Sequence, residues 1–516
     1  MVPTDLGFPP HFDSFRPAQL EGIEHILTSD KRFTAVGAPP GVGKSGIAVA
    51  LGRLLPGRTV ILTATLGLQD QYCGTFKGMV TDMRGRSHFR CWEGGTCEDG
   101  GRLGCGVKDG CPYLGKLKTF NQSEIGVTSY AWSLSAKNTQ AVDTLICDEA
   151  GLAPDWLSRS LDFTFTEKEC REAKVEGFDP LPGEDIDGWV KRYGAMMDAA
   201  TWQFERAKSN LNRTLSASAR DKALQALDHA DKFLASCERL SDLNADNWTI
   251  ERSEGTDVGR VWKFECVWPG RYREKLFKGI SRVILMSATL RPKTLGLLGV
   301  PWAECDFREW PRQFPAINGP VVWIPTARVG YKMSEEQERE WLGRIRQILN
   351  WGSDRKGLVH TVSFARARKI ADALDGYRLI LNGAADPDSA NGREAYQKFL
   401  KAPAGSTLVS PSFSTGWDFP LQTAEWQVIS KIAFPDARSK VMQTRIAKDR
   451  GYLNYLAAQD LVQGCGRIVR SDEDRGMTFL IDDQWTWFHG AAEEYLPKWF
   501  KVRREDSLPR PLPKII

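Results

Sequence analysis

This chain of 516 residues lacks the marks of several common protein classes. No apolar run approaches the roughly 20 residues that a membrane-spanning helix needs. Residues 1–15, MVPTDLGFPPHFDSF, lack the basic and apolar segments of a secretory signal peptide. Internal repeats and low-complexity tracts are absent too, which argues against a repeat array. We therefore expect a cytoplasmic or nucleoid-associated globular protein that does not act on membranes.

The chain also has little excess of charge of either sign. The formal net charge is only +4, so any contact with nucleic acid must come from a local groove. A hydrophobic content of 42% and a charged content of 26% are ordinary for a globular protein. The length predicts about two to four domains, because one hydrophobic core does not grow to this size.

Short apolar runs recur along the chain with helical stretches between them. Strands that alternate with helices in this way predict parallel sheets covered by helices, an α/β fold. The predicted strands are RFTAVGA (32–38), TVILTAT (59–65), DTLICDE (143–149), RVILMSAT (282–289), GLVHTVSF (357–364), STLVSPS (406–412), WQVISKIAF (426–434) and MTFLIDD (477–483).

Two blocks interrupt this rhythm, a cysteine- and glycine-rich block at 84–118 and a second block at 152–275. The centre of the second block predicts a long antiparallel helical hairpin, since apolar residues recur at helical spacing on both sides of the polar link 212–220. We interpret this apolar stripe as packing. Its residues are Trp189, Tyr193, Met196 and Ala200, then Ala223, Leu227, Ala230 and Leu234.

GAPPGVGKS (37–45) stands between a predicted strand and a predicted helix, as a phosphate-binding loop does. Glycines such as Gly41 and Gly43 let backbone N–H groups face phosphate oxygens, and the helix adds its positive N-terminal dipole. We expect Lys44 to reach the β- and γ-phosphates of ATP and the Ser45 hydroxyl to bind Mg²⁺. Ala38 stands where the strict pattern has its first glycine.

Two further motifs complete an ATPase site. ICDEAG (146–151) ends another strand, so Asp148 is placed to complete the Mg²⁺ shell and Glu149 to orient or deprotonate the attacking water. In QGCGRIVR (463–470), Arg467 and Arg470 share a helical face and can stabilise charge on the transferred phosphoryl group. These arginines lie far along the chain, which predicts two domains that close around the nucleotide.

With these motifs in place, the chain resembles a superfamily 2 helicase of the XPD/DinG iron–sulfur type over nearly its whole length. FRPAQ (15–19) resembles the adenine-sensing element, DEAG the DEAH box, and MSATL (286–290) motif III. The most specific stretch is AFPDARSK followed by YLAAQDLVQGCGRIVRSDEDRGMTFLIDD, similar to the family's C-terminal signature. The resemblance implies that Gln19 reads the base, that Gln463 joins the catalytic set, and that Gly416 and Asp418 sense the nucleotide.

The resemblance also implies a nucleic-acid path. TATLGLQDQY (63–72), VTSYAWSL (127–134) and VHTVSFARARKIADAL (359–374) resemble strand-contacting motifs, and RGRSHFR (84–90) could grip phosphates or be an ordinary solvated loop. Trp92 could stack a base. The candidate contacts are Thr63, Thr65, Thr128, Ser129, Tyr130, Ser363, Arg84, Arg86, Arg90 and Trp92.

In this family an iron–sulfur domain is inserted before the DEAH box and a helical Arch domain follows it, and the two interruptions occupy those places. The fold that the resemblance implies is two RecA-like parallel-sheet motor domains with both insertions in the first. The expected bounds are 1–83, 119–151 and 276–328 for motor domain 1, 84–118 for the cluster domain, 152–275 for the mainly helical Arch, and 329–516 for motor domain 2.

Gly151 departs from the family, because the DEAH histidine is thought to connect the ATP site with motifs III and VI. A glycine has no side chain for this connection, so tight coupling of hydrolysis to movement is in question. Hydrolysis itself needs Lys44, Asp148 and Glu149, which are all present.

Four cysteines, Cys91, Cys97, Cys105 and Cys111, are spaced C-x5-C-x7-C-x5-C. In a reducing cytosol clustered cysteines bind metal more often than they form disulfides, and from spacing alone zinc and [4Fe–4S] stay open. The position of the block in the family favours an iron–sulfur cluster over Zn²⁺. An insertion with so few apolar residues needs a metal centre to hold it together.

The expected activity is ATP-dependent unwinding of forked or duplex DNA by a monomer that moves 5′→3′ on single-stranded DNA, with the cluster domain as part of the wedge. DNA and direction are implied by the resemblance alone. One alternative is a translocase that remodels protein–nucleic acid complexes. Another is a non-enzymatic nucleic-acid-binding protein with a zinc clip.

Overall fold

The computed structural model describes the chain except for a set of short segments, and no helix within the described residues is both long and apolar enough to cross a bilayer. The segments outside the described residues are 93–94, 103–104, 106–109, 136–140, 176–182, 214–216, 384–389, 412–418, 420–422, 470–472 and 512–516.

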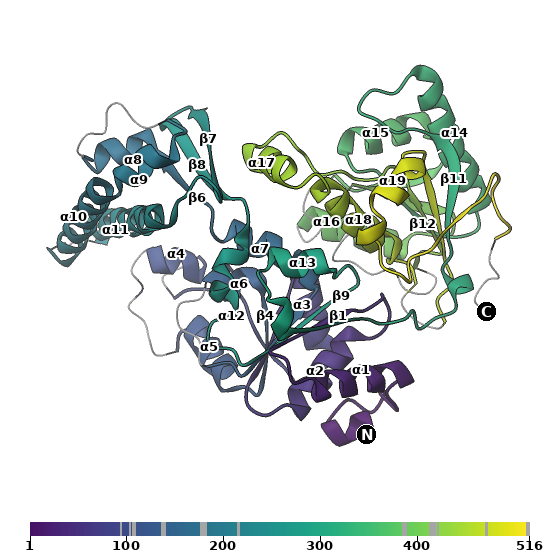
Figure 1. Ribbon diagram of the computed structural model, residues 1–516, viewed down its shortest axis with the longest axis horizontal. Coiled ribbons are helices and arrows are strands. Elements are labelled where there is room, and N and C mark those ends of the chain that lie inside the picture. Colours follow the sequence, from purple (N-terminus) through teal and green to yellow (C-terminus); the bar gives the residue numbers. More distant parts are fainter. Residues whose placement is uncertain are drawn as a thin grey trace.

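The first domain is built on a seven-stranded parallel sheet (Figure 1). Buried apolar residues fill the core on both faces of its central strands, which is typical of parallel sheets covered by helices. In spatial order the strands are β10 (Cys305–Glu309), β1 (Phe33–Gly37), β9 (Arg282–Ser287), β5 (Thr144–Asp148), β2 (Thr59–Thr63), β4 (Ile125–Ser129) and β3 (Thr81–Met83).

The second domain repeats this plan with another seven-stranded parallel sheet. In spatial order its strands are β13 (Arg378–Leu381), β14 (Ser406–Ser410), β12 (Gly357–His360), β15 (Trp426–Ile429), β16 (Met477–Asp482), β11 (Val321–Ala327) and β17 (Val502–Arg504). All eight strands predicted from apolar runs are present, and the two-sheet α/β architecture is confirmed.

One predicted domain boundary is wrong. The predicted bounds place residues 321–327 in motor domain 1, but β11 pairs in parallel with β16 and β17 in the second sheet. The second domain therefore begins before β11. The local sequence does not mark residues 321–327 as a strand, because proline is uncommon inside strands and Pro325 lies within β11. The register of β11 with β16 shifts between Trp323 and Ala327.

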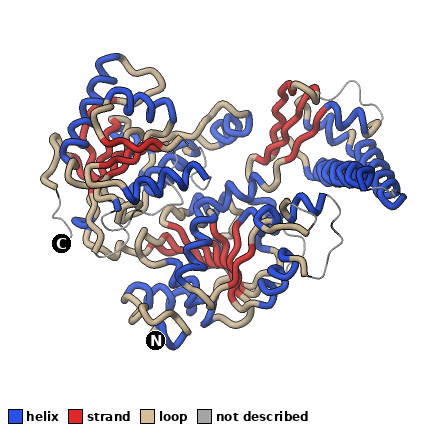
Figure 2. The backbone as a smooth tube through the Cα atoms, turned by 180° about the vertical axis from the view of Figure 1, so that it is seen from behind, coloured by secondary structure: helices blue, strands red, loops and turns tan. Residues whose placement is uncertain are grey.

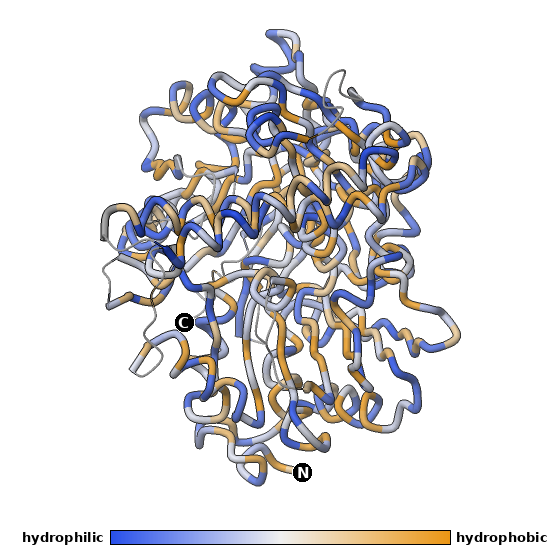
Figure 3. The backbone as a smooth tube through the Cα atoms, turned by 90° about the vertical axis from the view of Figure 1, so that its left-hand side faces the viewer, coloured by the Kyte–Doolittle hydropathy of each residue, from blue (hydrophilic) through white to orange (hydrophobic). Residues whose placement is uncertain are grey.

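The insertion between β5 and β9 projects from the first domain, as Figure 2 shows. The predicted hairpin is present as α10 (Tyr193–Arg213) and α11 (Ala217–Glu238), and hydrophobic and hydrophilic residues alternate along these helices in Figure 3. Trp189 falls in a separate short helix, α9 (Ile186–Lys191).

The insertion also holds a three-stranded antiparallel sheet that the helical periodicity did not predict. Its strands are, in spatial order, β6 (Phe163–Thr166), β8 (Gly259–Cys266) and β7 (Trp248–Gly255). Phe165, Trp262 and Phe264 of this sheet are fully buried in one core with Trp189 and Phe233. The insertion is thus mainly helical but rests on a sheet at its root.

Helices cover the sheets and link the domains. Those of the first domain and the cysteine block are α1 (Pro17–Thr28), α2 (Lys44–Leu54), α3 (Leu66–Thr75), α4 (Cys97–Arg102), α5 (Pro112–Gln122), α6 (Tyr130–Ser135), α12 (Glu274–Phe277) and α13 (Pro292–Leu297). The insertion adds α7 (Ala153–Arg159) and α8 (Glu167–Glu172). The second domain has α14 (Glu335–Trp351), α15 (Phe364–Ala373), α16 (Ala390–Lys401), α17 (Lys440–Lys448), α18 (Tyr452–Cys465) and α19 (Trp485–Ala491).

Candidate active site

The phosphate-loop sequence connects β1 to the N-terminus of α2, as predicted. Gly41 and Gly43 have φ of 79° and 82°, in the left-handed region where a Cβ is unfavourable. A Cβ on Gly43 would also lie 2.2 Å from Nε2 of Gln19. Lys44 is the first residue of α2, so its backbone and that of Ser45 lie at the positive end of the helix dipole.

The carboxamide of Gln19 faces this loop. Its Oε1 accepts from the backbone N of Arg16 at 2.9 Å, and its Nε2 donates to the Gly43 carbonyl at 3.4 Å. Arg16, which the sequence reasoning passed over, donates from Nη1 to the Gly41 carbonyl at 2.7 Å. Both side chains therefore support the loop backbone. The carboxamide of Gln19, which would have to hydrogen-bond to a nucleotide base, already makes hydrogen bonds to Arg16 and Gly43.

Asp148 is the last residue of β5 and Glu149 follows it, beside the loop. Asp148 is 1% exposed, accepts from the Tyr72 hydroxyl at 2.8 Å and accepts from the backbone N of Glu149 at 2.9 Å. Burial, together with the charge of Glu149, raises the pKa of Asp148 to about 6, while Lys44 and Tyr72 act in the opposite direction. The Lys44 ammonium lies 3.6 Å from Oε1 of Glu149, so it offsets the charge of the buried Asp148 and the partly buried Glu149.

Tyr72 was missed by the sequence reasoning. It is fully buried on α3, and its hydroxyl donates to Oδ2 of Asp148 at 2.8 Å. Burial and the Asp148 carboxylate raise its pKa well above the usual range, which keeps the hydroxyl neutral and able to donate. Tyr72 is the last residue of TATLGLQDQY, but nothing in the local sequence shows that its hydroxyl turns toward the acidic pair.

The second domain brings side chains to the same place through α18. Gln463 donates from Nε2 to Oε2 of Glu149 at 2.9 Å, and Arg467 donates to Oε1 of Gln463 at 3.3 Å. Ser287, at the end of β9, donates to the same Glu149 oxygen at 3.0 Å. The Glu149 carboxylate therefore links the DEAG motif to Ser287 of MSATL in the first domain and to Gln463 of QGCGRIVR in the second.

These groups surround a cavity of about 540 Å³ between the two domains. Both halves of the predicted site face it, so the lysine of one domain and the arginine of the other share a single cleft. Its lining includes His11, Phe12, Arg16, Gln19, Gly41, Gly43, Lys44, Ser45, Thr65, Asp148, Glu149, Gln463 and Arg467. Arg470, Gly416 and Asp418 lie outside the described residues.

Gly151 lies where the domains meet. A Cβ there would approach Thr289 Oγ1 to 2.5 Å, Ser287 Oγ to 3.2 Å and Gln459 Nε2 to 3.3 Å. Gln459, on α18, donates to the Gly151 carbonyl at 3.3 Å. The space that a side chain at position 151 would occupy is thus filled by neighbouring polar groups. The two domains are connected there by a hydrogen bond to the Gly151 backbone instead of through a histidine side chain.

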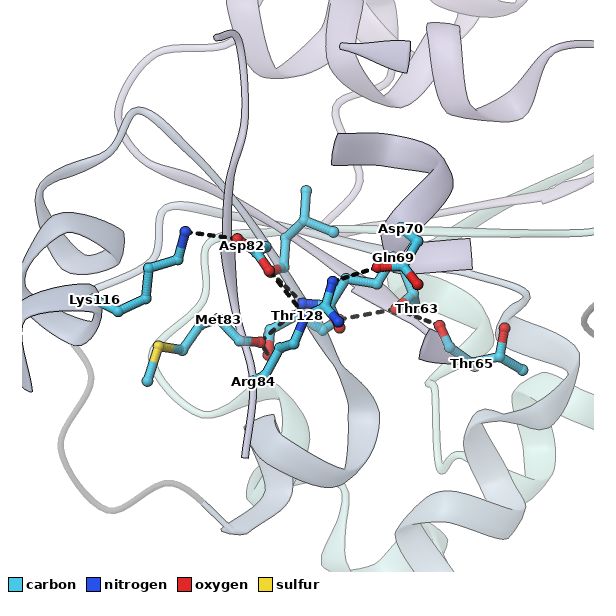
Figure 4. Close-up of polar contacts among 10 residues, drawn as sticks. Thr63, Thr65, Gln69, Asp70, Asp82, Met83, Arg84, Lys116 and Thr128 are labelled. Carbon is cyan, nitrogen blue, oxygen red and sulfur yellow. Dashed lines mark hydrogen bonds and ion pairs between the residues drawn. The ribbon is translucent and has the colours of Figure 1, made fainter. Parts of the chain in front are cut away.

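Three predicted nucleic-acid contacts are contradicted by burial. Thr63, Thr128 and Tyr130 have no exposed surface. As Figure 4 shows for the threonines, Thr63 donates to the carbonyls of Thr65 and Thr128, and Thr128 donates to the Met83 carbonyl. Tyr130 donates to the backbone carbonyl of Asp148 at 3.1 Å. These side chains hold the sheet edge and the catalytic strand together, because a hydroxyl that is buried needs an internal partner.

The other predicted contacts divide into capping residues and basic side chains. Thr65, Ser129 and Ser363 are partly buried, and each accepts a hydrogen bond from a backbone N of the helix that follows it. Arg84 is held by Asp70 and Asp82, which neutralise its charge (Figure 4). Arg86, Arg90 and Trp92 are exposed, and Trp92 has 71% of its surface accessible.

The four clustered cysteines lie close to one another around α4. Burial raises the pKa of the Cys97 thiol, and the neighbouring thiols of Cys111 and Cys91 raise it further, so these three cysteines lie near one another. A Cβ on Gly100 would lie 2.0 Å from Sγ of Cys91 and 3.5 Å from Cβ of Cys105, so only a glycine leaves room here. Among the described residues no group of three or more metal-binding side chains forms a ready-made site. All four cysteines are partly exposed and free of disulfides.

Comparison with known proteins identifies relatives of the fold and of the second domain. Residues 346–503 match the family model of the helicase C-terminal domain. An XPD helicase structure has a TM-score of 0.61 at 12% identity, covering 95% of this chain and 99% of that chain. An apo XPD structure gives 0.59 at 11% identity (95% and 100%), and Xpd4 from S. tokodaii gives 0.58 at 12% identity (95% and 100%). No curated protein sequence matches the chain.

At these identities the likeness concerns the fold. The two parallel-sheet domains and the insertions of the first domain together have the XPD fold, and residues 346–503 match the helicase C-terminal family model. The fold that the resemblance implies, two parallel-sheet domains with insertions in the first, is therefore confirmed. The chain spans nearly the full length of the XPD structures it resembles.

Proposed function

We propose that this protein is an ATP-dependent helicase that moves 5′→3′ on single-stranded DNA and separates duplex at a fork. The observation that carries the proposal is the cavity between the domains, which Lys44 and Arg467 line from opposite sides. Two domains that contribute different groups to one nucleotide close when it binds and open when it is hydrolysed. This cycle is what moves a strand past them.

Each polar group in the cavity has a chemical task in this proposal. Lys44 and the backbone N–H groups at the start of α2 bind the phosphates, and Ser45 with Asp148 would hold Mg²⁺, which supplies charge neutralisation on the phosphate oxygens. Glu149, fixed by Ser287 and Gln463, orients the attacking water and accepts its proton. Arg467 stabilises negative charge on the phosphoryl group.

Cys91, Cys97, Cys105 and Cys111 would hold a [4Fe–4S] cluster, which would serve as a structural centre for an insertion with little core of its own. The contacts of Cys91 and Cys105 with Gly100 and of Cys97 with Cys111 support this ligand set. The exposed side chains of Arg86, Arg90 and Trp92 stand next to the first ligand. Cations and an indole on one small surface are suited to single-stranded DNA at a fork.

The first experiment measures ATP hydrolysis with and without single-stranded DNA for the wild type and Lys44→Ala. We expect the variant to lose DNA-stimulated turnover and keep its fold by circular dichroism, because Lys44 contacts phosphate. Undiminished turnover would refute the site.

Unwinding and its direction are tested with fork substrates that carry a fluorescent strand and a single 5′ or 3′ tail. Matched RNA tails test whether the protein prefers DNA or RNA. Hydrolysis without strand release would favour the remodelling translocase.

The second experiment concerns the cluster. Protein purified anaerobically should be brown and contain iron and acid-labile sulfide, and Cys111→Ser should lose both together with fork unwinding while retaining some ATP hydrolysis. Cys73 lies outside the cysteine cluster and provides the matched control, since Cys73→Ser leaves the four ligands intact. Colourless protein loaded with zinc, or normal unwinding by Cys111→Ser, would contradict the assignment.

A further inference from the structure

The helix α18 presents a polar stripe to the first domain. Tyr455, Gln459 and Gln463 recur four residues apart, so they lie on one face of the helix. Each reaches a different part of the first domain: Tyr455 hydrogen-bonds to Thr294 Oγ1 at 2.8 Å, Gln459 to the Gly151 carbonyl, and Gln463 to Glu149. Gln463 belongs to the site already described, whereas Gln459 does not touch the nucleotide cavity.

The turn whose end Gln459 contacts, at Gly151, begins with a strained residue. Glu149 has φ of 51° and ψ of 45°, a left-handed conformation that costs on the order of 1 kcal/mol or more for a residue with a Cβ. Such a conformation persists only when its surroundings hold it. The Tyr130 hydroxyl binds the carbonyl before Glu149, and Gln459 binds the carbonyl of the turn after it. These two hydrogen bonds bracket the strained residue.

The orientation of the Gln459 amide is fixed. Its Nε2 makes two hydrogen bonds, to the Gly151 carbonyl at 3.3 Å and to the Tyr455 hydroxyl at 2.9 Å, and the side chain is 8% exposed. A flipped amide would set two oxygens against each other at Gly151. The glycine is what admits this arrangement, because its missing Cβ leaves the space that Thr289, Ser287 and Gln459 occupy.

We infer that Gln459 is a positioning residue that holds the strained turn at Glu149 when the second domain closes, and that Gly151 is glycine to let this residue reach the turn. Domain closure thereby sets the direction in which the Glu149 carboxylate points. This inference rests on the proposed ATPase function and extends it, since it assigns the connection between the domains to a residue outside the nucleotide cavity.

The test compares Gln459→Glu and Gln459→Leu with the same substitutions at Gln443. The glutamate variant keeps the shape of the side chain but removes the N–H donor. Gln443 is exposed on α17 and donates within its own domain, to the Arg438 carbonyl. We expect kcat for ATP hydrolysis to fall about tenfold in both Gln459 variants, the value of roughly one buried hydrogen bond, with KM for ATP near that of the wild type. The Gln443 variants should match the wild type.

A second readout does not need turnover. Amide hydrogen exchange in the peptide spanning residues 146–153 should speed up in both Gln459 variants and stay unchanged in both Gln443 variants. Wild-type kcat and exchange in Gln459→Glu would overturn the inference even if Gln459→Leu is impaired, because packing alone would then suffice. If the wild type binds ATP but never hydrolyses it, the proposed function fails, and the exchange result by itself supports or overturns the positioning of the turn.

Discussion

Individual residues decide how closely the two domains approach. Pro40 in the phosphate loop packs against Gly466, which follows α18, and a Cβ on Gly466 would come within 2.6 Å of the proline ring. Gly466 has φ of −87°, so the backbone itself accepts any residue. The requirement for glycine at this position comes from the contact across the cleft.

Gly466→Ala should therefore act as a wedge between the domains. Overpacking of about 1–3 kcal/mol at this contact predicts that kcat for ATP hydrolysis falls about tenfold or more. Gly464→Ala is the matched control, since the nearest atom to its new Cβ is Ile429 Cδ1 at an ordinary 3.4 Å. Steady-state ATPase assays on both variants check this. Equal rates for wild type and Gly466→Ala would show that the approach is not needed.

At the scale of elements, α17 connects the second domain to the root of the insertion. Arg445 on α17 is 8% exposed, and its guanidinium donates to the Val267 carbonyl at 2.9 Å, to Ser158 Oγ at 2.7 Å and to the Cys266 carbonyl at 2.8 Å. It also reaches the hydroxyl of Tyr452, the first residue of α18. Figure 1 shows α17 reaching from the second domain toward β7 and β8.

Arg445→Met keeps the length of the side chain and removes these donors. We expect a loss of stability of about 3 kcal/mol, because several buried acceptors are left without a partner. Thermal unfolding should show a lower Tm, and limited proteolysis should release the insertion sooner. The control is Arg438→Met, whose side chain is exposed and pairs with Asp436, and which should change stability by less than about 0.5 kcal/mol. A Tm equal to that of the wild type in Arg445→Met would contradict the docking contact.

For the whole molecule, the site exists only where two domains meet. Arg467 is 4% exposed and lines a cavity whose phosphate loop lies more than 400 residues earlier in the chain. In the proposed function, its charge reaches the phosphoryl group only when the two domains are closed. A group supplied in this way by a second domain acts mainly on the chemical step.

Arg467→Ala should reduce kcat by on the order of 10³ while ATP binding through Lys44 and the loop is largely retained. Binding is measured by equilibrium titration with a fluorescent ATP analogue, and turnover by single-turnover hydrolysis. Arg475→Ala, in the same domain but away from the cavity lining, serves as the control. A loss of binding that matches the loss of turnover would place Arg467 in ground-state binding instead.

Much of this architecture was predictable because local patterns encode it. Buried parallel strands are continuous apolar runs, and all eight such runs form strands. The strands that were missed are short, such as β3, or carry polar residues or proline, such as β10 and β11, and neighbouring strands supply their pairing. The first strand of the insertion sheet was missed because β6 is short and pairs with residues of β8 that lie about 100 residues further along the chain.

The sequence by itself determined the phosphate loop, the acidic pair and the order of the motifs, because each depends on residue type and spacing within a few positions. Tertiary structure alone decided that Thr63, Thr128 and Tyr130 point inward, that Gln19 braces the loop and that Gln459 meets Gly151. Those facts depend on which atoms lie opposite one another across a sheet or a domain boundary. Spacing along the chain carries no information about such distances, which packing sets.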